Sequence, residues 1–170
     1  KLSFPGKSGK FHQVVFSDRR VAKVMCQCRD IPGQYLFSFE TDEGTPKNVN
    51  STLVNSYLRE IAGEAVTAKD FRTWWGSVVA LAEVAAMPDD LSPTARKRAV
   101  VAAVKATAEE LGNTQSVCRG SYIHPGILAA AESGELPSLV ANSKKSMKRG
   151  AELTNEERLF KAILPYLEFS

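Results

Sequence analysis

The stretch Val117-Cys118-Arg119-Gly120-Ser121-Tyr122-Ile123-His124-Pro125 places a tyrosine just after a predicted break between two short helices. Gly120 is expected to end the first helix, and Pro125 to begin the second. A free tyrosine is a poor nucleophile because its phenol titrates near ~10. If Tyr122 is to attack a substrate, other parts of the chain must supply positive charge and a proton donor.

The composition is that of ordinary globular material, 44% apolar and 24% charged, and a length of 170 residues suits one domain, or one domain and a small appendage. Lys and Arg number 22 against 19 Asp and Glu, a net charge of +3 that permits nucleic-acid binding without arguing for it. There is no signal peptide and no apolar run long enough to span a membrane. The three cysteines fit neither a disulfide framework nor a zinc site, so we expect a reducing cytoplasm.

The N-terminal third is predicted to mix short strands with helices. Leu2–Phe4 and Phe11–Phe16 read as a hairpin, and Gly6-Lys7-Ser8 in its loop lacks the earlier glycine of a phosphate-binding loop. Residues 35–39 read as a strand. Ser17 is expected to cap a helix that runs to about Arg29, and Ser51 a helix that Gly63 closes. The residues expected to face inward from these two helices are Val21, Val24, Met25, Cys28, Val54, Tyr57, Leu58 and Ile61.

The remainder is predicted to be helical. A helix opens at Thr67 and ends at Pro88, and another starts at Ser92-Pro93 and ends at Gly112. The first carries an apolar stripe, expected to be core, of Phe71, Trp74, Trp75, Val78, Leu81 and Ala85; the second turns Val100, Val104 and Leu111 inward. The basic run Arg96-Lys97-Arg98 is expected to be a solvated face.

Short helices are expected from Asn113-Thr114 to about Arg119 and from Pro125. Residues 134–150 read as a mobile polar linker. A last amphipathic helix follows a capping box of Thr154 and Glu157, and Pro165 is expected to kink it. The predicted fold class is α+β, mainly α-helical, with a small N-terminal β-hairpin region. The predicted domains are a catalytic domain (1–140), a basic linker (141–153) and a C-terminal helix (154–170).

Two groups of motifs resemble one known family. The first is Thr67-Ala68-Lys69-Asp70-Phe71-Arg72-Thr73-Trp74; the second joins Leu111-Gly112-Asn113-Thr114 to Val117-Cys118-Arg119 and Ser121-Tyr122-Ile123-His124-Pro125. In this order and spacing they resemble the catalytic domain of bacterial, poxvirus-like type IB DNA topoisomerases, over roughly Leu2 to Val140. The resemblance implies the fold shared by type IB topoisomerases and tyrosine recombinases.

The resemblance also implies an activity. Such enzymes, which are isomerases, relax supercoiled double-stranded DNA by nicking one strand through a 3′-phosphotyrosine, and they need neither a metal ion nor a nucleotide cofactor. By motif, Tyr122 is the nucleophile and Arg72, Lys7 and Asn113 complete the catalytic set in this chain. A further arginine is expected a few dozen residues before Lys7, so we expect a catalytic fragment that starts at Lys1 without it. A monomer in the cytoplasm, associated with the nucleoid, is expected.

These residue types suit the implied chemistry. Arg72 offers a planar, permanently charged fork for two phosphate oxygens, and Asn113 can donate an uncharged amide hydrogen bond. Lys7 could protonate the leaving 5′-oxygen as a general acid. His124 is expected to orient the turn or contact a phosphate. The residues predicted to contact DNA are Lys10, Lys69, Arg119 and His124.

Two alternatives remain open. A tyrosine recombinase shares the fold and chemistry, but such enzymes usually carry histidine where this chain has Lys69. They also end in a segment that docks on a neighbouring subunit, which the last helix could do. A non-catalytic DNA-binding fragment is the second alternative. Taken singly, each site residue also has a plain structural role: Tyr122 as a half-buried aromatic, Arg72 as an ion-pair former, Asn113 as a helix N-cap.

Overall fold

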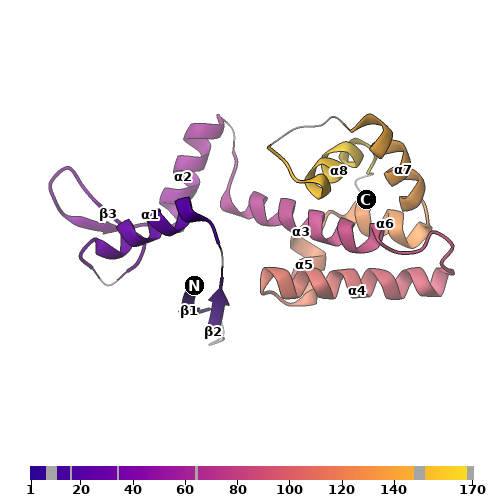
Figure 1. The fold of residues 1–170 in the computed structure, drawn as a ribbon, viewed down its shortest axis with the longest axis horizontal. Helices are drawn as coiled ribbons and strands as arrows, with labels where there is room; N and C mark the ends of the chain where they lie inside the picture. Colours follow the sequence, from indigo (N-terminus) through magenta and orange to yellow (C-terminus); the bar gives the residue numbers. More distant parts are fainter. Residues whose placement is uncertain (7–10, 16, 34, 64, 148–151, 168–170) are drawn as a thin grey trace. The chain divides into compact units, whose positions relative to one another are not determined.

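A computed structural model describes residues 1–6, 11–15, 17–33, 35–63, 65–147 and 152–167 of the chain (Figure 1). The fold divides into two compact units, which are described separately: unit 1, Lys1–Ala68, and unit 2, Lys69–Ser170. Both strand pairs lie in unit 1, and unit 2 is helical over its described residues. The prediction of a mainly helical α+β chain is therefore confirmed.

Unit 1 contains two small antiparallel sheets and two helices. In the first sheet, β1 (Leu2–Pro5) pairs with β2 (Phe11–Val14), which confirms the predicted hairpin. In the second, β3 (Ser38–Glu40) pairs with β4 (Pro46–Asn48). The helices are α1 (Arg19–Asp30) and α2 (Ser51–Ala62).

Both predicted N-caps in unit 1 are wrong by one residue, whereas Gly63 closes α2 as predicted. The side chain of Asp18, not Ser17, caps α1 by accepting hydrogen bonds from the backbone N–H groups of Arg20 (2.7 Å) and Val21 (3.2 Å). At α2, Asn50 replaces Ser51 as the cap. Carboxylate and amide oxygens accept such bonds as well as a hydroxyl does, so two adjacent cap-forming residues leave the helix start undecided in the sequence.

The predicted inward faces of α1 and α2 are largely exposed. Neither helix contains a buried residue. Val24 is 55% exposed, and Tyr57 and Ile61 are each 61% exposed. The helical period correctly identified an apolar face on each helix, but the prediction that this face is buried is wrong, because burial also needs a packing partner.

Unit 2 is built from helices that pack around α3. Their bounds are α3 (Ala68–Ala85), α4 (Pro93–Leu111), α5 (Gln115–Ser121), α6 (Pro125–Ser133), α7 (Leu136–Ser146), α8 (Asn155–Ile163) and the 3₁₀ helix η2 (Leu164–Tyr166). As predicted, Ser92 caps α4 with Pro93 in its first turn, and Gly112 closes it with a left-handed φ of 64°. None of the described helices is both long and apolar enough to cross a membrane.

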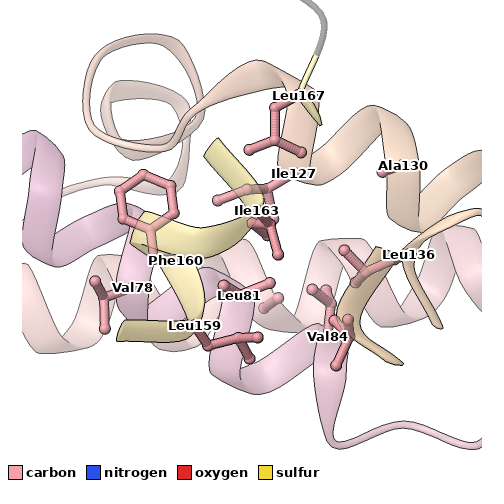
Figure 2. Close-up of a cluster of buried hydrophobic side chains, with 12 residues drawn as sticks. Val78, Leu81, Val84, Ile127, Ala130, Leu136, Leu159, Phe160, Ile163 and Leu167 are labelled. Atoms are coloured by element: carbon pink, nitrogen blue, oxygen red, sulfur yellow. The ribbon is translucent and has the colours of Figure 1, made fainter. Parts of the chain in front are cut away.

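Helix α3 contributes to both hydrophobic clusters of unit 2. On one side, its Val78, Leu81 and Val84 pack with residues of α6, α7 and α8 (Figure 2). On the other, Ala80 packs with residues of α4, α5 and α6. The buried part of α3 therefore begins at Gly76, and the turn before it, which carries Arg72, leads directly into this core.

The N-terminal end of the predicted α3 stripe is not core. Phe71 is 59% exposed and Trp75 is 40% exposed, so the prediction is wrong for these two rings. Trp74 does pack inward, with its ring edge-to-face on Phe160 at 4.9 Å between centroids. Its indole N–H also donates to Glu157 (3.1 Å), which ties α3 to α8.

The C-terminal part is more ordered than predicted. Helix α7 occupies much of the predicted linker, and its Val140 and Ser143 are buried. The capping box of Thr154 and Glu157 is confirmed, but Pro165 lies in η2, after α8 has ended, rather than in a kink. The two compact units divide after Ala68, and the predicted domain boundaries at residues 140 and 153 stay predictions.

Arg96 is not part of a solvated face. Its Nε donates to the carbonyl of Glu132 (3.1 Å) and its Nη1 to that of Leu91 (3.0 Å). Lys97 and Arg98 are exposed as predicted. One guanidinium thus joins the start of α4 to the end of α6, which a run of three basic residues does not reveal.

Candidate active site

Arg72 and Tyr122 come together from different elements of unit 2. Arg72 lies in the first two turns of α3, and Tyr122 is the residue after the last turn of α5. The guanidinium carbon of Arg72 stands over the Tyr122 ring, 4.8 Å from its centroid. A cation at this distance is attracted to the ring face, so the contact holds a permanent positive charge next to the phenol.

Asn113 and Arg72 share one hydrogen-bond acceptor, the carbonyl oxygen of Leu111. Arg72 Nη2 donates to this oxygen at 2.9 Å, and Asn113 Nδ2 donates to it at 3.1 Å. The turn after α4 presents the oxygen: Gly112 is left-handed, and the Asn113 N–H returns to the carbonyl of Ala108 at 2.8 Å. Two hydrogen-bond donors and a tyrosine therefore converge from three separate parts of the chain.

Asn113 is not the helix cap that its position after Gly112 suggested. Thr114 caps α5, with its Oγ1 accepting from the Val117 N–H at 3.3 Å. The Asn113 amide is thus left to the site, where its described bond is to Leu111.

Cys118 and His124 flank the tyrosine in the chain, and the carbonyl of Cys118 accepts from the Tyr122 N–H at 3.0 Å. Burial raises the pKa of the Cys118 thiol, while the nearby charge of Arg72 acts in the opposite direction. Burial lowers the pKa of His124, and its Nδ1 accepts from the Gly126 N–H (3.2 Å) as the cap of α6. As the cap of α6, His124 is placed to orient the turn, which is one of the two roles predicted for it.

The other predicted DNA contacts lie in varied surroundings. Lys69, at the start of α3, is exposed. Arg119 is also exposed and pairs with Glu132 at 3.2 Å. Lys7 and Lys10 lie outside the described residues.

Sequence reasoning missed the groups that hold this site together. They are the carbonyl of Leu111 and three residues of α3, namely Thr73, Gly76 and Ser77, which contact the backbone on either side of Tyr122. Gly76 gave a usable signal, because a glycine inside a helix costs about 0.5–1 kcal/mol relative to alanine and often marks a close approach. A backbone carbonyl gives no such signal.

Comparison with known proteins agrees with this arrangement. The family described as "Eukaryotic DNA topoisomerase I, catalytic core" matches residues 1–154. The chain belongs to this DNA topoisomerase I family. It is also similar to "DNA topoisomerase 1B" of Acanthamoeba polyphaga mimivirus, with 30% identity over 130 residues, which is 72% of this chain. The chain spans 38% of the length of that relative.

The family match covers every element of this topoisomerase I chain up to the start of α8, including all four predicted catalytic residues. It supports the type IB part of the sequence prediction. Among the described residues, no group of three or more His, Cys, Asp or Glu side chains is placed to hold a metal ion.

Proposed function

We propose that this chain carries the catalytic centre of a type IB topoisomerase, which relaxes supercoiled duplex DNA by transient cleavage and religation of one strand. Tyr122 is the nucleophile in this proposal. The single observation that supports it most is that Arg72 and Asn113 donate to one oxygen, the carbonyl of Leu111, while the Arg72 guanidinium stands over the Tyr122 ring.

The proposed reaction is a transesterification. The Tyr122 Oη attacks the scissile phosphorus, the phenolic proton passes to water, and the bond to the 5′-oxygen breaks, leaving a 3′-phosphotyrosine. The freed 5′-oxygen takes a proton from Lys7, and its later attack on phosphorus reverses the step. The phosphotyrosine conserves the energy of the broken ester, so no nucleotide cofactor is required.

Arg72 and Asn113 act on the nonbridging oxygens, where negative charge gathers as the phosphorus is attacked. The Leu111 carbonyl accepts from both residues in the described structure. A phosphate oxygen presents the same kind of acceptor with more negative charge, so it can replace this carbonyl as the common partner of the two donors. The donors are then already close together before DNA arrives.

The recombinase alternative is less well supported. Its last segment would dock on a neighbouring subunit, whereas α8 already buries Leu159, Phe160 and Ile163 in the core of its own unit. Lys69 at the start of α3 also favours the topoisomerase. The proposal further includes a bacterial, poxvirus-like protein that acts as a monomer in the cytoplasm at the nucleoid, and this part rests on the sequence resemblance alone.

The test is plasmid relaxation by the full protein that carries this chain, without ATP and with a chelator of divalent cations. Wild type should relax the plasmid, and Tyr122→Phe should not. Arg72→Ala should slow cleavage by about 10²–10³, as for loss of one oxyanion donor, with duplex affinity largely kept. Relaxation by Tyr122→Phe at the wild-type rate would rule out the proposed nucleophile.

A further inference from the structure

Three residues on one face of α3 hold the backbone around Tyr122. Gly76 and Ser77 follow Thr73 by three and four residues, so all three lie on the same side of the helix. We call these three residues the α3 seat. None of them was assigned a role by the sequence motifs, and none touches the phenol through a described hydrogen bond.

The two hydroxyls of the seat bracket the tyrosine. Thr73 Oγ1 lies 3.3 Å from the carbonyl oxygen of Ser121, the residue before Tyr122, and 3.2 Å from that of Lys69. Ser77 Oγ accepts a hydrogen bond from the N–H of His124 at 2.9 Å. Ser77 is 1% exposed, so this bond is shielded from water. The backbone is thus fixed just before Tyr122 and two residues after it.

Gly76 brings the helix against Tyr122 itself. A Cβ atom on Gly76 would stand 2.5 Å from the carbonyl oxygen of Tyr122, closer than such atoms approach in proteins. It would also stand 3.1 Å from Leu111 Cδ1. The carbonyl of Leu111 accepts hydrogen bonds from Arg72 and Asn113. The absence of a side chain at Gly76 therefore allows both Tyr122 and Leu111 to pack closely against α3.

The segment needs such support because its own structure is short. Helix α5 has seven residues, and an isolated helix of that length is not stable. Tyr122 and Ile123 alone separate α5 from His124, the cap of α6. A nucleophile must nevertheless be held to within a fraction of an ångström for efficient attack.

We propose that the α3 seat is a set of positioning residues that sets the distance between the Tyr122 phenol and the donors Arg72 and Asn113. This inference rests on the proposed role of Tyr122 as nucleophile. The seat acts through the backbone of residues 121–124 and not on the DNA. Changing it should therefore slow strand cleavage while leaving DNA affinity unaltered.

The decisive experiment compares two glycine-to-alanine variants of the full protein. Gly76→Ala places a methyl group against Tyr122, whereas Gly120→Ala, also within a helix, places one where no atom lies within 4 Å. Single-turnover cleavage of a suicide substrate should fall about 10²-fold in Gly76→Ala, as for a misplacement of about 1 Å, and should be unchanged in Gly120→Ala. The dissociation constant for duplex DNA should be unchanged in both.

A second pair tests the hydroxyl of Thr73 without adding bulk. Thr73→Val keeps the shape of the side chain but cannot donate to the carbonyl of Ser121. This variant should cleave about tenfold more slowly, as for one lost hydrogen bond. Thr73→Ser keeps the hydroxyl and should restore the rate. Wild-type cleavage rates in Gly76→Ala and Thr73→Val would overturn the proposal. A loss of duplex DNA affinity as large as the loss of cleavage rate would also overturn it.

A spectroscopic readout separates this proposal from the proposed function. In protein with 13C-labelled tyrosine rings, the Tyr122 signal is assigned by its absence in Tyr122→Phe. That signal should shift in Gly76→Ala and keep its place in Gly120→Ala, whether or not Tyr122 is the nucleophile. An unshifted signal in Gly76→Ala would overturn the seat even if relaxation proceeds through Tyr122.

Discussion

Units 1 and 2 differ in whether the apolar faces of their helices are buried. Unit 1 has amphipathic helices, yet the only residue buried among its described positions is Ser38. All the buried hydrophobic residues of the described chain belong to unit 2, where α3 lies between two clusters. An apolar stripe therefore specifies which face of a helix can be buried, and a packing partner decides whether it is.

The largest expected effect is on folding of the separated units. Residues 69–170 contain a core of their own, so they should unfold cooperatively when expressed alone. Residues 1–68 bury too little apolar surface to offset the entropy of folding and should show no cooperative transition. Calorimetry of the two pieces measures this directly. A cooperative transition in the 1–68 piece would remove the contrast between the units.

A matched pair of isoleucines tests the contrast in the whole chain. Ile163 in α8 is 0% exposed and Ile61 in α2 is 61% exposed. Ile163→Ala should lower the free energy of unfolding by about 2–5 kcal/mol, the range for a large-to-small change in a core. Ile61→Ala should change it by about 0.5 kcal/mol or less, as surface substitutions do. Denaturant titration gives both values, and equal losses would contradict the account.

Sequence reasoning succeeded where a signal was local and failed where it depended on a partner. Gly63, Gly112 and the Thr154–Glu157 box were predicted correctly because each acts within one turn of a helix. The exposure of Trp75 and the burial of Val140 were not predicted, because burial depends on which helix packs against each residue.

The same division applies to the candidate site. Tyr122, Arg72 and Asn113 were identified from motifs, and the structure brings them together. The Leu111 carbonyl and Ser77 were not identified, since a backbone oxygen and a common serine leave no mark in one sequence. Their roles follow only from distances between segments far apart in the chain.

Two neighbouring arginines of α4 give a smaller test within unit 2. Arg96 donates to the carbonyls of Leu91 and Glu132, whereas Arg98 is exposed. Arg96→Ala should reduce the free energy of unfolding by about 1.5–3 kcal/mol, as for hydrogen bonds to a charged group. Arg98→Ala should leave it unchanged within about 0.5 kcal/mol. A similar loss in both variants would restore the solvated-face interpretation of this run.

The smallest expected effect is a pH dependence of the contact between α3 and α8. The hydrogen bond from the Thr154 backbone, followed by that from the Trp74 indole, lowers the pKa of Glu157 below its ordinary 4.5. Its contribution to stability is therefore complete above pH 4.5 and is lost as the pH falls through the lower folded value. Thermal unfolding between pH 6 and pH 3 should show this loss in wild type. Glu157→Gln should show a smaller decline, and an identical one would exclude Glu157 as a source.

The central claim is that Tyr122 forms the covalent bond to DNA, and mapping the adduct tests it most directly. The full protein is trapped on a suicide substrate, digested with protease, and the peptide that carries DNA is sequenced by mass spectrometry. The account predicts a 3′-phosphoryl group on Tyr122 and no adduct with Tyr122→Phe. An adduct on Tyr35, Tyr57 or Tyr166, or one that persists in Tyr122→Phe, would contradict it.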